Sequence, residues 1–292
     1  MVATGSPALL KRWIAFNLRQ LRKEAGRDRS EVMERLGMSR AQVGHLETAE
    51  RLPSKPVLEI LLGFYGVSER LPDFLRIVEA ARKGKNWWEK FSEAVPAWFN
   101  LYLGLETGVA ELASFDALLV PGLLQTPRYA EAVIRADRDL SDTDVRQRVE
   151  LRSGRQHILE RQDDPVHLWV VLDESVLTRL RGSAEIMCEQ LEHLLTMSQR
   201  PRVDIQILKQ DAGAHMAQQG GTFSLMTFPP EMVGDPGVVY HELMTTGLYL
   251  EDPRDIAVYR HEWGHLQAIA ATPEESRAII QQALKHWKEV TT

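Results

Sequence analysis

The segment from Ser39 to His45 combines side chains that suit hydrogen bonding to the edges of DNA bases. Arginine pairs bidentately with guanine and glutamine with adenine, so Arg40 and Gln42 are the candidates for direct base contacts. Ala41 is small and apolar, as a contact with the methyl group of thymine requires. His45 either reaches a base or a phosphate, or is an exposed side chain without a role. Ser39 is the expected N-cap of the helix that carries these residues, which together predict binding of double-stranded DNA.

Three basic residues flank that segment and are candidates for contacts with the DNA backbone. Arg29 stands at the start of the preceding helix, and Arg51 and Lys55 follow the segment. Phosphate contacts strengthen binding without reading the base sequence, and they make the affinity depend on salt. Two further arginines, Arg19 and Arg22, are expected to be solvated.

A competing signal for catalysis lies near the end of the chain. His261, Glu262 and His265 spell the HExxH pattern, which in zinc peptidases places two histidine ligands and a glutamate base on one helix. A third histidine in the spacing of one such family would fall at Ala271, and Gly264 weakens the helix between the ligands. The sequence therefore favours a chain that binds no metal and is not an enzyme. A metallopeptidase fused to a DNA-binding head is the alternative.

Other chemistry has weaker support in the sequence. The single cysteine, Cys188, excludes an internal disulfide and a cysteine-rich zinc site, and its thiol is expected to be buried. No nucleophile elbow or phosphate-binding glycine loop is present, and no cofactor is expected. Asp173, Glu174, His215 and Glu242 either meet at strand ends as a pocket for a small molecule or partner, or are solvated charges.

Charge is distributed unevenly along the 292 residues. Residues 1–85 hold 16 lysines and arginines against 10 acidic residues, whereas the remainder holds 19 against 31. A basic module joined to an acidic one is a common plan for a nucleic-acid-binding regulator. No apolar run approaches the roughly 20 residues of a membrane helix. Lys11 and Arg12 interrupt the N-terminal segment, which therefore lacks the apolar core of a signal peptide. We therefore expect a cytoplasmic protein without membrane contact.

Five short helices are predicted in residues 1–82 from apolar residues recurring at spacings of three and four. Asp28 and Glu31 have the spacing of a capping box at the start of the second helix. Gly37 breaks the pattern between the second and third helices and predicts a tight turn. Residues 83–100 are rich in aromatics and are expected to form a helix buried at the junction, with a partner-binding surface as the alternative.

Residues 101–292 are predicted to form a larger, acidic, mixed α/β domain, which makes the chain α+β overall. Helices are expected early in this domain and at its end. The strand-like runs are 166–174, 203–208, 222–228, 237–243 and 247–252. Because a helix separates the first two runs, they are expected to form a βαβ unit within a mixed sheet.

The first module resembles the phage-repressor-like, Xre-type helix-turn-helix family over about residues 11–80. The resemblance rests on Ala25–Gly26, on LGMSRAQVGHLE from Leu36 to Glu47, and on FYGV from Phe64 to Val67. It implies that the third helix enters the major groove and that the protein binds DNA as a homodimer. It also implies that Glu47 ties that helix to the following loop. Arg29 departs from the family pattern, which usually has a phosphate-binding glutamine there.

The remainder resembles the C-terminal domain of bacterial antitoxin-like transcriptional regulators over about residues 95–285. The phrases that carry the resemblance are PGLLQTPRYA, SGRQHIL, LDESVLTRL, IQILKQDAGAH, GGTFSLMTF, VVYHE and YLED. The resemblance implies a regulator, often encoded beside a small partner protein. We expect the second domain to mediate dimerisation and a regulatory protein contact. An interaction module without specific DNA binding is a further alternative.

Overall fold

The computed structural model describes residues 6–49, 51–84, 86–91, 95–96, 98–230, 232 and 234–290. They form two compact units. The first comprises the residues up to Glu89 together with the short segment 229–235, and the second comprises the rest. The expected α+β class is confirmed, with a helical head followed by a mixed α/β domain.

The head contains the five predicted helices. They are α1 (Pro7–Glu24), α2 (Arg29–Leu36), α3 (Arg40–Glu47), α4 (Lys55–Phe64) and α5 (Leu71–Lys83). Large apolar side chains from several of them, including Leu18, Leu58 and Phe74, are almost completely inaccessible to solvent. A bidentate ion pair adds to this unit, with Arg12 donating to the two carboxylate oxygens of Asp235 at 3.1 and 2.9 Å.

Local sequence signals set the boundaries of the two helices that form the predicted DNA-binding motif. Asp28 and Glu31 form the predicted capping box of α2, each accepting a backbone N–H from the other at 2.8 and 2.9 Å. Gly37 ends α2 with φ of 62°, a left-handed conformation that glycine adopts without the steric cost of a side chain. Ser39 then caps α3, as predicted. The tight turn between the helices is therefore encoded locally.

The predicted junction helix over 83–100 is wrong, because α5 ends at Lys83 and the next α-helix starts only at Phe99. Gly84 is extended rather than helical, with φ of −65° and ψ of 139°, and a short 3-10 helix spans Glu89–Phe91. The aromatic residues described in this stretch are nevertheless buried or partly buried, as expected. Trp88 and Phe91 are the most enclosed of them.

The second unit is built around one six-stranded sheet. Its strands are β1 (Glu111–Asp116), β2 (His167–Asp173), β3 (Val203–Leu208), β4 (Phe223–Thr227), β5 (Val238–Glu242) and β6 (Gly247–Leu250). The longer helices are α6 (Phe99–Glu106), α7 (Pro127–Ile134), α8 (Asp142–Arg155), α10 (Ala184–Met197), α12 (Pro253–Ile269) and α13 (Pro273–Val290). The predicted βαβ unit is confirmed as β2–α10–β3.

The strand order is β3-β2-β1-β4-β5-β6, with β1, β2 and β3 parallel and the remaining neighbours antiparallel. The mixed sheet was predicted, but β1 was missed. This strand pairs with both β2 and β4 and therefore joins the parallel and antiparallel halves. Its sequence, ELASFD, contains residues that are poor strand formers, which explains the omission.

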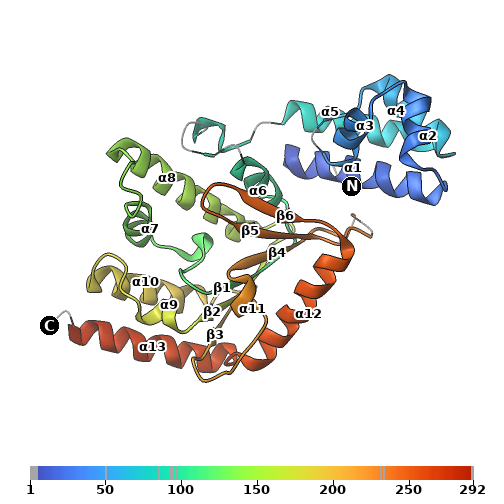
Figure 1. Ribbon diagram of the computed structural model, residues 1–292. Helices are drawn as coiled ribbons and strands as arrows, with labels where there is room; N and C mark the ends of the chain where they lie inside the picture. The colour runs from blue at the N-terminus through green and yellow to red at the C-terminus, as the bar shows by residue number, and fades with distance from the viewer. Residues whose placement is uncertain are drawn as a thin grey trace. The chain divides into compact units, whose positions relative to one another are not determined.

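Helices cover both faces of the sheet, with α7, α8 and α10 on one side and α12 on the other (Figure 1). On the α12 side, Trp263 and Leu266 join Phe115, Val171 and Val239 of the strands in one buried cluster. Among the described residues no helix is long and apolar enough to cross a membrane.

Candidate nucleic-acid interface

Helix α3 presents the predicted base-reading residues to solvent and its apolar residues to the core. Val43 and Leu46 are 1% and 4% exposed. The side opposite them carries the exposed residues Arg40, Ala41 and Gln42. Arg40 makes no hydrogen bond or ion pair to any residue the structure describes, so its guanidinium is available to an external partner. This arrangement is the one a major-groove reading helix requires.

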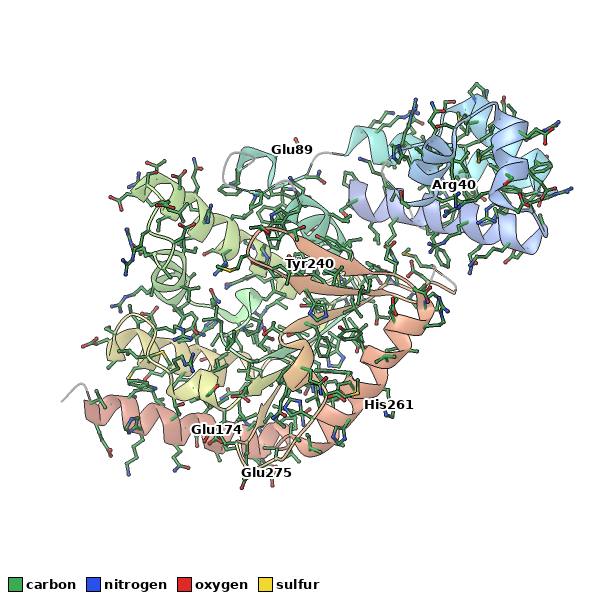
Figure 2. All side chains as sticks on the ribbon, in the orientation of Figure 1. Arg40, Glu89, Glu174, Tyr240, His261 and Glu275 are labelled. Atoms are coloured by element: carbon green, nitrogen blue, oxygen red, sulfur yellow. The ribbon has the colours of Figure 1, made fainter. Side chains whose placement is uncertain are left out.

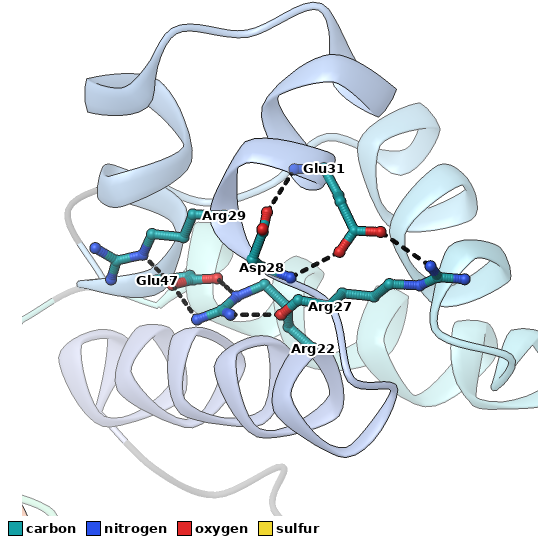
Figure 3. A network of polar contacts seen from close by, with 6 residues as sticks. All are labelled: Arg22, Arg27, Asp28, Arg29, Glu31 and Glu47. Atoms are coloured by element: carbon teal, nitrogen blue, oxygen red, sulfur yellow. Dashed lines mark hydrogen bonds and ion pairs between the residues drawn. The ribbon is translucent and has the colours of Figure 1, made fainter.

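The orientation of α3 is fixed by a buried network at its last residue, Glu47 (Figure 3). Arg22 of α1 donates to the two carboxylate oxygens of Glu47 at 2.6 and 3.3 Å, and to the carbonyl of Arg27 at 2.8 Å. Arg29 of α2 donates its Nε–H to Glu47 at 2.9 Å. One carboxylate thus links three helices. Burial, and after it the negative charge of Glu47, raises the pKa of the nearby Tyr65.

Two sequence-based expectations about this network are wrong. Glu47 ties α3 to α1 and α2 rather than to the following loop, and Arg22 is buried rather than solvated. The signal that reveals Arg22 is its position four residues after Leu18, which places it on the apolar stripe of α1. A charged residue on a buried stripe requires a partner, and Glu47 supplies it.

Gln42 completes the cap at the start of α3, of which the sequence predicted only the N-cap residue Ser39. The side-chain oxygen of Gln42 accepts the backbone N–H of Ser39 at 2.9 Å, and the backbone N–H of Gln42 donates to the Ser39 hydroxyl at 3.3 Å. Because the N–H of Ser39 must donate, the acceptor is Oε1, and the amide NH₂ remains for an external group. A bidentate pair with adenine needs both ends of the amide, so it requires this cap to open.

The predicted phosphate-binding residues lie at the surface around α3. Arg29 is 44% exposed, and only its Nε is used by Glu47. Arg51 is exposed, and its backbone N–H donates to the carbonyl of His45 at 3.0 Å, which joins it to the end of α3. Lys55 is exposed at the start of α4, with its Nζ 3.8 Å from Glu59. His45 is also exposed.

The HExxH residues of α12 have the opposite orientation from a metal site. His261 and His265 are exposed, and Figure 2 shows His261 on the outer side of the helix. Glu262 instead points inward, where it accepts the backbone N–H of Ala217 at 2.9 Å and lies 3.8 Å from His215. The part of the chain that the structure describes holds no group of three residues suited to a metal ion.

Three of the four residues that were considered as a strand-end pocket have separate partners in the structure. Glu174 accepts the backbone N–H of Gln210 at 3.0 Å and so links the segments that follow β2 and β3. Asp173 accepts the backbone N–H of Ser175 at 2.9 Å, within its own turn. His215 packs against Phe115 instead. Cys188 is a free cysteine and only partly buried, which differs from the buried thiol expected.

Family models match both the head and the second domain. Residues 13–75 match the model of a helix-turn-helix domain. No curated protein and no solved structure matches the chain. Residues 99–282, more than half of the chain, match the model described as a domain of unknown function (DUF5753), and the chain therefore belongs to that family.

Proposed function

We propose that this protein is a sequence-specific, antitoxin-like transcriptional regulator of the Xre type. It binds double-stranded operator DNA as a homodimer through α3. The second domain mediates dimerisation and contact with a regulatory protein, for which a small protein encoded nearby is the candidate. The protein acts in the cytoplasm, without catalysis and without a cofactor.

The observation that carries this proposal is the contrast between the two sides of α3. Its inner side is held by Val43, Leu46 and the Glu47 network, whereas its outer side presents Arg40 and Gln42 without burial. Rigid support beneath exposed hydrogen-bonding side chains lowers the cost of ordering them on DNA. The match of residues 13–75 to a helix-turn-helix domain supports the same assignment.

A gel-shift experiment with the full chain tests the proposal. The probe is the DNA upstream of the protein's own gene, and the competitor is a scrambled duplex of equal length. We expect a preference of about 10³-fold or more at physiological salt, as is typical of specific binding. Equal retention of both duplexes would instead favour the interaction module without specific DNA binding.

The sheet offers a surface for the proposed dimer contact at β6. The opposite edge strand, β3, is occupied, because Ile207 accepts a backbone N–H from Ala271 and donates its own to Ser276. On the outer side of β6 no described strand pairs, and Leu248 of β6 and Met244 just before it are exposed. Pairing of β6 with its copy would bury these side chains and the free backbone groups.

Light scattering after size exclusion tests the dimer. A homodimer has twice the chain mass of 33.2 kDa. Leu243 donates its backbone N–H to Thr246, so by the alternation of an antiparallel ladder the backbone N–H of Tyr249 faces the outer edge of β6. Proline in place of Tyr249 is expected to give the monomer mass if β6 forms the contact. A wild-type monomer at micromolar concentration would refute the dimer, and an unchanged dimer in Tyr249→Pro would place its contact elsewhere.

A further inference from the structure

Three arginines share one stripe of α8 in the second domain. Arg148, Arg152 and Arg155 are spaced by four and three residues, so their side chains leave the same side of the helix. The charge of Arg155 is balanced by Glu106. Its Nε and Nη2 donate to the two oxygens of Glu106 at 2.9 and 2.7 Å, and both side chains are less than a tenth exposed.

Arg152 is held differently, by a neutral group. Its Nη1 donates to the side-chain oxygen of Gln125 at 2.8 Å, and no carboxylate of the described residues lies within ion-pair distance. Gln125 is itself 4% exposed and donates to the carbonyl of Val120 at 2.6 Å. The guanidinium of Arg152 is therefore oriented by a rigid amide, but its charge is not cancelled.

Arg148 adds to the excess of positive charge. Its Nη1 lies 3.7 Å from Asp137, and both side chains are substantially exposed, so this ion pair is weak. Its Nε is buried and has no hydrogen-bond partner among the described residues. Such a group costs stability unless something outside the chain satisfies it.

Burial and the neighbouring arginines make the charged form of Arg152 less favourable. Burial lowers its pKa to about 10, and the positive charges of Arg155 and Arg148 act in the same direction. The carboxylate that opposes them, Glu242, is exposed on β5 and outside ion-pair distance. A partly buried cation that is positioned by neutral groups and repelled by its neighbours is stabilised by binding an anion.

We propose that Arg152 and Arg148 bind the oxyanion of a small effector, either a phosphate or a carboxylate group. Arg152 presents a planar fork of N–H donors that matches two oxygens of such a group. Its donors other than Nη1 make no bond to the described residues and are not buried, so an anion can reach them. The partial burial of the site favours a small molecule over a macromolecule.

Thermal unfolding of the full-length protein tests this site with inorganic phosphate and, separately, succinate, each against sodium chloride at equal ionic strength. For the binding anion we expect a saturable rise in Tm of about 3–5 °C at ten times its Kd. Arg152→Met removes the charge and keeps the apolar stem. It leaves the buried oxygen of Gln125 without this donor, so the variant is expected to fold with a somewhat lower Tm and to lose the anion response.

Arg146→Met is the matched control, because Arg146 lies on the same helix, is exposed, and among the described residues has one hydrogen bond, to the Thr143 hydroxyl. It is expected to respond to the anion as the wild type does. An equal response in Arg152→Met would overturn the proposal. Calorimetric titration of the wild type gives a test that does not depend on any variant. The absence of saturable binding of either anion up to about 100 mM, one hundred times a millimolar Kd, would also overturn the proposal.

Discussion

Arg22 lies with its Nε 2.6 Å from the carboxylate of Glu47, and both side chains are almost completely buried. Removing one member of such a pair leaves the other charged and unpaired in the interior. Glu47→Ala is therefore expected to lower the free energy of unfolding by about 3–5 kcal/mol, measured by urea denaturation. Glu59→Ala removes only a long, exposed ion pair with Lys55 and is expected to cost less than about 1 kcal/mol. Equal losses in the two variants would contradict the structural role of Glu47.

The cap between Ser39 and Gln42 allows folding and DNA binding to be separated. Gln42→Glu keeps the side-chain oxygen that accepts the N–H of Ser39, and glutamate is favourable at this position of a capping box. It removes the NH₂ donor and adds a negative charge facing DNA. We expect an unchanged Tm by circular dichroism and at least a tenfold loss of operator affinity by fluorescence anisotropy. Retained affinity would show that Gln42 does not contact DNA.

Arg40 and Arg51 are predicted to act on different parts of the DNA. Arg40→Ala should weaken binding to the preferred operator by about 1–3 kcal/mol while affecting unrelated DNA much less. Arg51→Ala should weaken both similarly and reduce the salt dependence, log K against log salt concentration, by about 0.9. Anisotropy titrations at several salt concentrations measure both effects. If Arg51→Ala left the salt slope unchanged, its assignment to a phosphate would be wrong.

The stability of the protein is expected to depend on pH through Asp116. Its carboxylate is buried at the end of β1 and accepts a hydrogen bond from the Ser114 hydroxyl at 2.6 Å, and burial raises its pKa to about 7. The folded state therefore keeps a proton that the unfolded state has released between pH 4 and 7, so stability falls as pH rises through this window. From pH 5 to 8 the loss is about 2–3 kcal/mol, and Asp116→Asn should remove it. Urea denaturation of both proteins at the two pH values measures the difference, and parallel profiles would contradict the raised pKa.

The HExxH segment gives a prediction that separates a structural from a catalytic glutamate. Glu262→Leu leaves the N–H of Ala217 buried and unpaired and should cost about 1–3 kcal/mol of stability. His265→Ala changes an exposed side chain and should cost less than about 0.5 kcal/mol. Metal analysis of the purified wild-type protein completes the test. Stoichiometric zinc that is lost in His265→Ala would establish the peptidase alternative.

The sequence signals succeeded where structure is determined by neighbouring residues and failed where it depends on distant ones. Capping at Asp28 and Ser39 and the left-handed Gly37 are local, so the helices of the head were predictable. Strand β1 has weak local preference and is held by pairing with β2 and β4, which no local pattern reveals.

The candidate DNA-binding residues show the same division. Exposure of Arg40 and Gln42 follows from the period of α3 and could be predicted. The bond from Arg22 to Glu47 joins residues 25 positions apart and depends on how the helices pack. The inward turn of Glu262 also depends on packing, because the letters of a motif fix the spacing along a helix but not which side of that helix faces the core.

The pairing of β1 with β4 has a consequence for biosynthesis. Glu111 is aligned with Thr227, so the middle of the sheet cannot close until the ribosome has made the residues up to Thr227. The five helices of the head, in contrast, are all complete by Lys83, so the contacts among them all lie within the first 83 residues. Local contacts form faster than distant ones, and domains fold in order as they emerge. The five helices of the first unit can therefore pack while the second unit is still an open chain, and segment 229–235, with Asp235, joins them only later.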